Sequence, residues 1–222
     1  MKLCYFVLLV AMLAGKIAVS ASAAEPADAK LPKVVLIGDS IRMGYAPFVI
    51  EAFKGKATVI SNKANGGDSA RVLANLDDWA ISEQPDVVHF NCGLHDLKVS
   101  RKTKQPQIPF DQYESNLKKI VERLQKETKA KLIFATTTPI VDSRHAKRKG
   151  EFDRREADVL RYNEVAEKVM KDANVEINDL HALVIKEGSE KTLRSDGTHY
   201  EAANSRKLAK QVTDAVTKRL PE

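Results

Sequence analysis

Five short, continuous apolar runs constrain the fold of this chain more than any other feature of its sequence. They lie at 34–37, 57–60, 87–90, 132–135 and 175–177. Strands without polar alternation are typical of a parallel sheet that is buried on both faces. The runs therefore predict a parallel sheet at the centre of the molecule.

Helical patterns lie between these runs, so the chain alternates strand with helix. Apolar residues share one helical face at Ala70, Leu73, Leu76 and Ala80, at Leu117, Ile120, Val121 and Leu124, and again within 159–170 and 208–216. This alternation predicts an α/β protein, a three-layer α/β/α sandwich with right-handed crossovers. Because no linker interrupts the pattern, we assign one domain to residues 33–222.

The N-terminus has the parts of a secretory signal peptide. Lys2 is followed by an apolar stretch over 3–14, and small residues fill 21–24. The stretch is shorter than the ~20 residues of a membrane span, which favours cleavage over an uncleaved anchor. We therefore expect a signal peptide at 1–24 and a short leader at 25–32. The mature protein is expected to be secreted or periplasmic, without stable membrane insertion.

Composition excludes several classes of protein. With 43% hydrophobic and 30% charged residues, the chain is not a coiled coil, a collagen or a disordered polymer. The net charge of +6 is mild, and no zinc-finger or RNA-binding pattern accompanies it, so no nucleic acid is expected as a partner. Cys4 falls within the signal peptide, which leaves Cys92 as a buried thiol without an internal disulfide.

The first segment with chemical potential is Gly38-Asp39-Ser40, directly after the first apolar run. A serine there is presented at the end of a strand, beside the free N–H groups of a helix N-terminus, which suit an oxyanion. The alternative is that Asp39 or Ser40 only caps the helix. The triplet alone leaves both interpretations open.

The second segment is Asp196-Gly197-Thr198-His199, just before the last helical pattern. A nucleophilic serine needs a base, and a base histidine needs a carboxylate that selects its tautomer. By itself this spacing also fits a capping aspartate and a surface histidine. Together with a serine at a strand end, it favours a triad of Ser40, His199 and Asp196.

Two further loops follow the second and third apolar runs. In Asn65-Gly66-Gly67-Asp68-Ser69 the glycines allow close backbone approach, which suits an oxyanion donor but also a capped tight turn. The loop at 91–96, Asn91-Cys92-Gly93-Leu94-His95-Asp96, places further side-chain donors at the same edge of the sheet.

In this order the four segments resemble the SGNH hydrolases, also called GDSL esterases, over nearly the whole mature chain. Gly38-Asp39-Ser40 matches the first family block. Gly67 matches the glycine of the second block, and Gly66 is the less favoured match. Asp196 to His199 match the last block. The resemblance implies the flavodoxin-like SGNH hydrolase fold and a serine hydrolase acting on carboxylic esters. It implies no metal and no organic cofactor.

The resemblance also implies an oxyanion hole, and here the chain departs from the family. The backbone N–H groups of Ser40 and Gly67 would donate, with a third-block asparagine that is replaced here by His95. A neutral imidazole N–H can also donate, so we expect His95 to take this role, oriented by Asp96. Asn91 is a second candidate.

Other residues carry weaker expectations. Arg42, Asn65 and Asn91 are possible substrate contacts, although Arg42 is about equally compatible with a surface position. The basic stretch at 144–155 is expected to be solvated, or to attract anionic sugars or lipid if it borders the cleft. His89 is expected in the core or at the sheet edge, and His145 and His181 at the surface.

Export and the family resemblance together predict a serine esterase that removes acyl groups, acetyl in the simplest case, from carbohydrate. The expected partner is a small-molecule or polysaccharide ester, and the oligomeric state is not indicated. Lysophospholipid or thioester hydrolysis is the enzymatic alternative. A non-catalytic glycan-binding module on the same fold is the alternative of another class, but binding alone does not need the three triad residues.

Overall fold

A five-stranded parallel sheet forms the centre of the computed structural model, which describes Met1 and residues 31–221. Its strands run in the order β2-β1-β3-β5-β7. Their bounds are β1 (Lys33–Ile37), β2 (Thr58–Ser61), β3 (Val87–Phe90), β5 (Lys131–Ala135) and β7 (Glu176–Asn178). Every neighbouring pair is parallel. Each strand overlaps one of the apolar runs, with shifts of one residue at several ends, so the predicted parallel sheet is confirmed.

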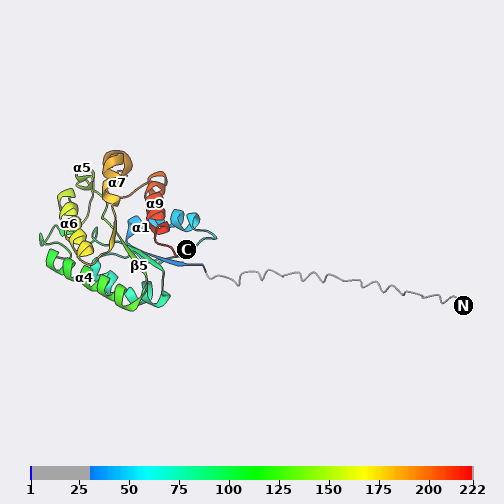
Figure 1. Ribbon diagram of the computed structural model, residues 1–222. Coiled ribbons are helices and arrows are strands. Elements are labelled where there is room, and N and C mark those ends of the chain that lie inside the picture. The colour runs from blue at the N-terminus through cyan, green and yellow to red at the C-terminus, as the bar shows by residue number, and fades with distance from the viewer. Residues whose placement is uncertain (2–30, 222) are drawn as a thin grey trace. The chain divides into compact units, whose positions relative to one another are not determined.

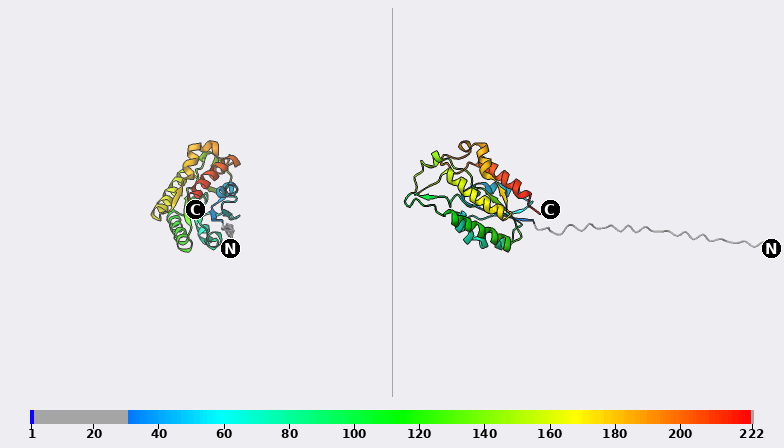
Figure 2. Two further views of the ribbon diagram at one scale, coloured as in Figure 1. Left: turned by 45° about the vertical axis from the view of Figure 1, so that its right-hand side comes forward. Right: turned by 60° about the vertical axis from the view of Figure 1, so that its left-hand side comes forward.

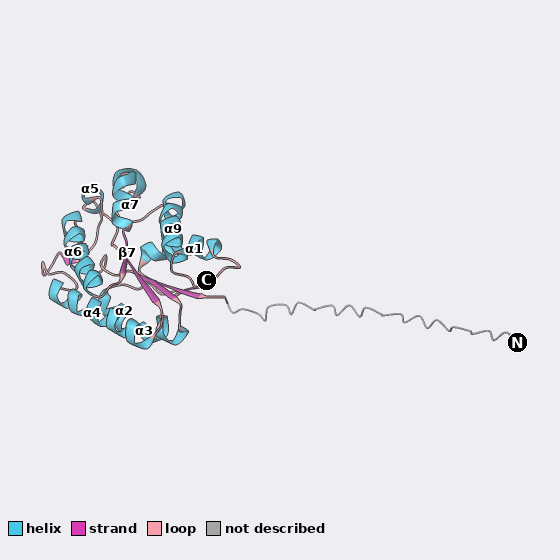
Figure 3. Ribbon diagram, in the orientation of Figure 1, coloured by secondary structure: helices cyan, strands magenta, loops and turns pink. Residues whose placement is uncertain are grey.

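Helices cover both faces of this sheet. They are α1 (Ser40–Ala52), α2 (Ser69–Ala74), α3 (Leu76–Trp79), α4 (Phe110–Glu127), α5 (Asp142–His145), α6 (Glu156–Asp172), α7 (Leu180–Glu187), α8 (Ser189–Thr192) and α9 (Ala202–Thr217), with a 3₁₀ turn at Ile81–Glu83. α1 packs against α9 on one side, and α4 lies between α2 and α6 on the other (Figures 1 and 3). Figure 2 shows the sheet between these groups, as expected for a three-layer sandwich.

The apolar patterns explain most of the packing. All four residues of β3 are fully buried, and α4 turns the expected face inward, with Leu117, Ile120 and Leu124 at 0% exposure. The pattern at 70–80 is the exception. There the helix breaks at Asn75, between α2 and α3, and Ala70 is exposed while Val72 is buried.

Strand register brings the loops of interest to one edge of the sheet. Ile37 pairs with Phe90, and Phe90 pairs with Phe134, so the residues that follow β1, β3 and β5 leave the sheet side by side. The chain moves from β1 outward to β2 and then back to β3 on the other side. This reversal is the point at which open α/β sheets bind their ligands, beyond the carboxyl ends of the strands.

A two-stranded antiparallel ribbon, absent from the sequence predictions, lies outside the sheet. β4 (Val99–Ser100) pairs with β6 (Phe152–Asp153). β6 belongs to the irregular basic stretch, and two-residue strands are too short for a periodic pattern to reveal them.

The chain from Leu31 onward groups as one compact unit. Apart from Met1, the expected signal peptide at 1–24 lies outside the described residues, and so does most of the expected leader. Among the residues that are described, no helix is both long enough and apolar enough to cross a membrane.

Candidate active site

Ser40 is placed by the junction between β1 and α1. It is the first residue of α1, and the preceding Asp39 caps the helix by accepting a hydrogen bond from the N–H of Ile41 at 2.9 Å. Asp39 is buried, and burial raises the pKa of its carboxyl group against the hydrogen bond from Ile41. Asp39 therefore has the capping role that the sequence suggested for one residue of the triplet. Ser40 does not cap the helix and lies half-buried at its N-terminus.

Ser40, His199 and Asp196 form a continuous hydrogen-bonded chain. The Oγ of Ser40 lies 2.9 Å from Nε2 of His199, and Nδ1 of His199 lies 2.7 Å from Oδ2 of Asp196. A carboxylate only accepts, so Nδ1 carries the imidazole proton and Nε2 is left to accept from the Ser40 hydroxyl. The tertiary structure thus joins three residues from opposite ends of the chain into a nucleophile, a base and an orienting carboxylate.

The turn that carries the base is held by Asp196 itself. Oδ1 of Asp196 accepts the backbone N–H groups of Thr198 and His199, each at 2.9 Å. Although partial burial acts in the other direction, the hydrogen bonds from His199 and Thr198 lower the pKa of Asp196 to about 2. Gly197 has a φ of 70°, and a Cβ there would lie 2.6 Å from the carbonyl oxygen of Val141. Only glycine fits this turn without displacing its neighbours.

The loop after β2 lies directly against the nucleophile segment. The N–H of Gly66 donates to the carbonyl of Gly38 at 2.9 Å, so Gly66 is engaged within the backbone. Gly67 has a φ of +68°, and its N–H donates to Oδ1 of Asn65 at 2.9 Å. Asn65 was expected as a substrate contact. Its side-chain oxygen instead accepts the hydrogen bond from the N–H group that Gly67 was expected to offer to an oxyanion.

His95 lies in the loop after β3 with a partner that the sequence did not suggest. Its Nδ1 is 2.9 Å from Nζ of Lys98. Burial, followed by the positive charges of Lys98 and Arg154, lowers the pKa of His95 to about 4. Asp96 does not orient His95, because its Oδ1 accepts the backbone N–H of Ser69 at 2.9 Å. The buried Asp96 instead joins this loop to the Gly67 loop.

Arg42 is a buried brace between two loops, where the sequence suggested a substrate contact or a surface position. It is only 4% exposed. Its guanidinium donates to the carbonyls of Gly38, Asn62 and Ala64 at 3.0, 2.6 and 2.6 Å, and to Oγ of Ser61 at 2.9 Å. Arg42 therefore holds the segments after β1 and β2 together, and burial lowers its pKa.

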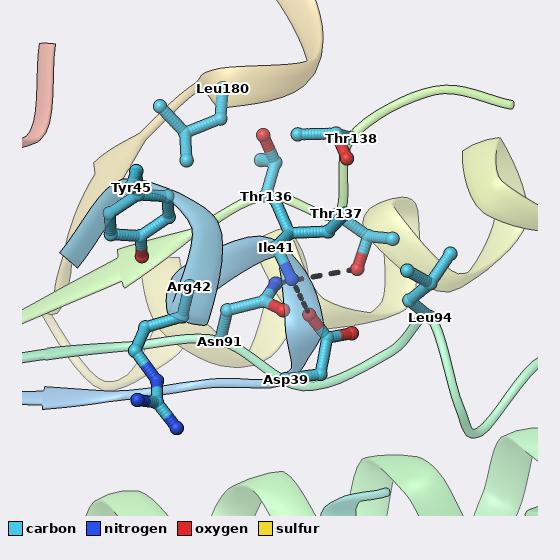
Figure 4. Close-up of a pocket in the computed structure, with 10 residues that line it drawn as sticks. All are labelled: Asp39, Ile41, Arg42, Tyr45, Asn91, Leu94, Thr136, Thr137, Thr138 and Leu180. Atoms are coloured by element: carbon cyan, nitrogen blue, oxygen red, sulfur yellow. Dashed lines mark hydrogen bonds between the residues drawn. The ribbon is translucent and has the colours of Figure 1, made fainter. Parts of the chain in front are cut away.

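Asn91, expected as a possible substrate contact, has a comparable bracing role. Its Nδ2 donates to the carbonyl of Ala135 at 2.8 Å and lies 3.4 Å from Oγ1 of Thr137. Figure 4 shows Asn91 beside Thr137 at a small cavity next to the start of α1. The cavity holds about 10 Å³ and is lined by both neighbours of Ser40 in sequence, Asp39 and Ile41.

The remaining histidines differ from their predictions in part. His89 is fully buried, as expected, with Nδ2 of Asn178 at 3.0 Å from its Nε2. His145 is buried rather than solvated, with Nδ1 3.3 Å from Oγ1 of Thr198. His181 is also not solvated, because its Nε2 lies 2.7 Å from Oε1 of Glu156 and only 14% of its side chain is exposed.

The basic stretch divides into structural and exposed residues. Arg154 is buried and donates from Nε to the carbonyl of Leu94 at 2.7 Å. Arg144 donates to the carbonyls of Leu193 and Glu190 at 2.9 and 2.7 Å. The exposed cations of the stretch are Lys147, Lys149 and Arg155. The sequence shows that the stretch is basic, but only the fold shows which of its side chains are buried.

Lys98 and Arg154 are the residues near the site that sequence reasoning missed. The spacing of Lys98, three residues after His95, was the available signal for the first. For Arg154 there was none beyond its place in a basic run. Within Met1 and residues 31–221, no group of three or more His, Cys, Asp and Glu side chains could hold a metal ion.

In this parallel α/β sandwich a serine, a histidine and an aspartate are hydrogen-bonded at the carboxyl edge of the sheet. This arrangement is typical of serine hydrolases. Residues 36–206 match the GDSL-like Lipase/Acylhydrolase family. The chain belongs to this family and is an ester-hydrolysing enzyme.

Individual relatives agree with this assignment. The chain is 24% identical over 205 residues to GDSL esterase/lipase CPRD49 of Arabidopsis thaliana, covering 83% of this chain and 78% of that protein. The lipase/acylhydrolase of Enterococcus faecalis has a similar fold, with a TM-score of 0.72 at 22% identity over 86% of this chain and 98% of that one. Axe2, an acetylxylan esterase from Geobacillus stearothermophilus, has a similar fold with a TM-score of 0.66 at 20% identity, over 84% of this chain and 94% of that one.

Proposed function

We propose that this chain is an exported serine esterase that removes short acyl groups, acetyl in the simplest case, from carbohydrate. The observation that carries the reaction type is the hydrogen-bonded chain from Ser40 through His199 to Asp196. Export is inferred from the N-terminal sequence. The carbohydrate substrate is supported by export and by the similar fold of an acetylxylan esterase.

In the proposed mechanism His199 takes the proton of Ser40 at Nε2 while Oγ attacks the carbonyl carbon of the ester. The tetrahedral oxyanion accepts from the Ser40 backbone N–H and from Nε2–H of His95. It also takes over the N–H of Gly67 from Asn65, because a charged oxygen accepts more strongly than an amide oxygen. The intermediate collapses, the alcohol leaves with the proton of His199, and an acyl-Ser40 remains.

Hydrolysis of the acyl-enzyme repeats these roles. His199 removes a proton from water at Nε2, the hydroxide attacks the acyl carbonyl, and the same donors hold the second oxyanion. The carboxylic acid leaves and Ser40 regains its proton. Throughout, Asp196 keeps Nδ1 of His199 protonated and stabilises the transient imidazolium.

The preference for acetyl esters over the lysophospholipid alternative is supported by the similar fold of the acetylxylan esterase Axe2.

Hydrolysis of a panel of acetylated polysaccharides, with acetate release measured, tests the proposal. The wild type should release acetate and Ser40→Ala should not, while both fold equally by circular dichroism. A p-nitrophenyl ester series should show kcat/KM falling from acetate to longer chains. Preference for long chains would sink the acetyl assignment, and full activity of Ser40→Ala would sink the triad. Failure of a fluorophosphonate probe to label Ser40 would also count against the nucleophile.

A further inference from the structure

Lys98 contacts the histidine that replaces the family asparagine. Its Nζ lies 2.9 Å from Nδ1 of His95. An ammonium group has three donors and no acceptor, so the hydrogen bond runs from lysine to imidazole. Nδ1 of His95 must then carry the lone pair, and the single proton of the neutral ring lies on Nε2.

The surroundings hold Lys98 in place. The carbonyl of Lys98 accepts the N–H of Gln107 at 2.7 Å, and β4 begins at the next residue and pairs with β6. Nζ lies 4.9 Å from the ring centroid of Phe152 in β6, and the guanidinium of Arg154 lies 4.9 Å from the same centroid. The β4–β6 ribbon therefore positions the cation against His95 and is not a free surface feature.

Arg154 connects the ribbon to the His95 loop a second time. Its Nε donates to the carbonyl of Leu94, the residue before His95, at 2.7 Å. The loop is thus held through its backbone by one cation and through its imidazole by another. Asp96 fixes the same loop from the other side, through the N–H of Ser69.

We propose that Lys98 is a positioning residue for the oxyanion hole, which keeps His95 neutral with its proton on Nε2, the nitrogen that donates to the oxyanion. The inference rests on the proposed function, because it assigns a device to the same site. Because Lys98 donates to Nδ1, the ring proton of His95 is fixed on Nε2. An asparagine amide at this position would offer an N–H donor without such a partner.

The charges that face His95 agree with a neutral ring. Lys98 from its own loop, Arg154 directly after β6 and His199 from the last turn each disfavour a second proton, whereas Asp68 favours it. Together with burial they lower the pKa of His95 to about 4. His95 is therefore a neutral donor throughout the range from pH 5 to 8.

Nitrogen-15 NMR of histidine-labelled protein tests the tautomer without using activity. In the wild type, Nδ1 of His95 should be unprotonated and Nε2 protonated from pH 5 to 8. In Lys98→Met, Nδ1 should gain partial protonation and the titration midpoint should rise toward the ordinary value of 6.5. Lys98→Arg retains a donor and a charge and serves as the matched control. A proton on Nδ1 in the wild type, or identical spectra for wild type and Lys98→Met, overturns the proposal.

Kinetics of the double-mutant cycle separates positioning from a structural role. Lys98→Met should lower kcat on the order of tenfold, less than the ~10²–10³ for loss of a donor, with KM little changed. In the His95→Ala background the same substitution should have no further effect, because Lys98 acts through His95. An equal loss in both backgrounds overturns the inference. Full activity of Ser40→Ala would instead refute the proposed function and leave the NMR result standing.

Discussion

Two loops bring a histidine to the same edge of the sheet, and they prepare it in opposite ways. Nδ1 of His199 faces a carboxylate, Asp196, at 2.7 Å, whereas Nδ1 of His95 faces an ammonium group, Lys98, at 2.9 Å. The acceptor leaves Nε2 of His199 able to take a proton. The donor leaves Nε2 of His95 able to give a hydrogen bond. The same side chain is thus prepared as a proton acceptor or as a hydrogen-bond donor, according to the group behind it.

Asp196→Asn should remove this difference between the two histidines, and it is expected to cause the largest loss of kcat among these predictions. An asparagine amide can donate to Nδ1, which would give His199 the tautomer that Lys98 gives His95. We expect kcat for a small acetate ester to fall by ~10⁴, because Nε2 then carries a proton and cannot accept one from Ser40. His199→Ala should fall at least as far. Activity within tenfold of wild type would show that Asp196 does not select the tautomer.

His95→Ala should have a smaller effect, since it removes one donor and leaves the base intact. A fall in kcat of ~10²–10³ is expected, measured with a p-nitrophenyl acetate assay at pH 7.5. His95→Asn supplies an amide like that of the family and should recover most of the loss. Near wild-type turnover of His95→Ala would exclude the residue from the oxyanion hole.

The smallest effect expected is on stability in mild acid. The pKa values of His95, His89 and His145 are each lowered to about 4 by burial, from an ordinary 6.5. Between those values these histidines bind protons in the unfolded chain but not in the folded chain, so they lower the free energy of unfolding as pH drops from 6.5 toward 4. Asp96, whose pKa burial raises to about 6, acts in the opposite direction over part of this range. The carboxyl of Asp196, with its pKa at about 2 instead of 3.8, should add a further loss below pH 4.

Urea unfolding at pH 7.5, 6 and 5 measures this trend. His145→Asn removes one of the buried rings and should flatten the slope relative to the wild type. The same slope for His145→Asn and for the wild type would show that His145 does not stay neutral in the folded protein.

The fold was largely predictable because its signal is local. Five apolar runs became the five strands of the sheet, and the faces within α4, α6 and α9 turned inward as expected. Where the periodic signal was weak, prediction failed: one expected helix breaks at Asn75, and the β4–β6 ribbon was not foreseen. Two-residue strands depend on contacts between distant segments.

The site was predictable in part. Gly38-Asp39-Ser40 and Asp196 to His199 were selected from spacing and resemblance, and the structure brings their serine, histidine and aspartate into contact. Arg42 and Asn91 looked equally polar in sequence but donate their hydrogens to backbone carbonyls. A polar residue near a strand end can face the cleft or brace the loops, and the sequence does not distinguish these because both depend on neighbours far along the chain.

The sequence by itself determined the alternation of strand and helix, the edge at which the chemistry gathers and the residue types available there. Only the tertiary structure decided which partner stands behind each imidazole. That choice depends on a few ångströms between segments separated by many residues, and a proton follows the nearest donor or acceptor rather than the order of the chain.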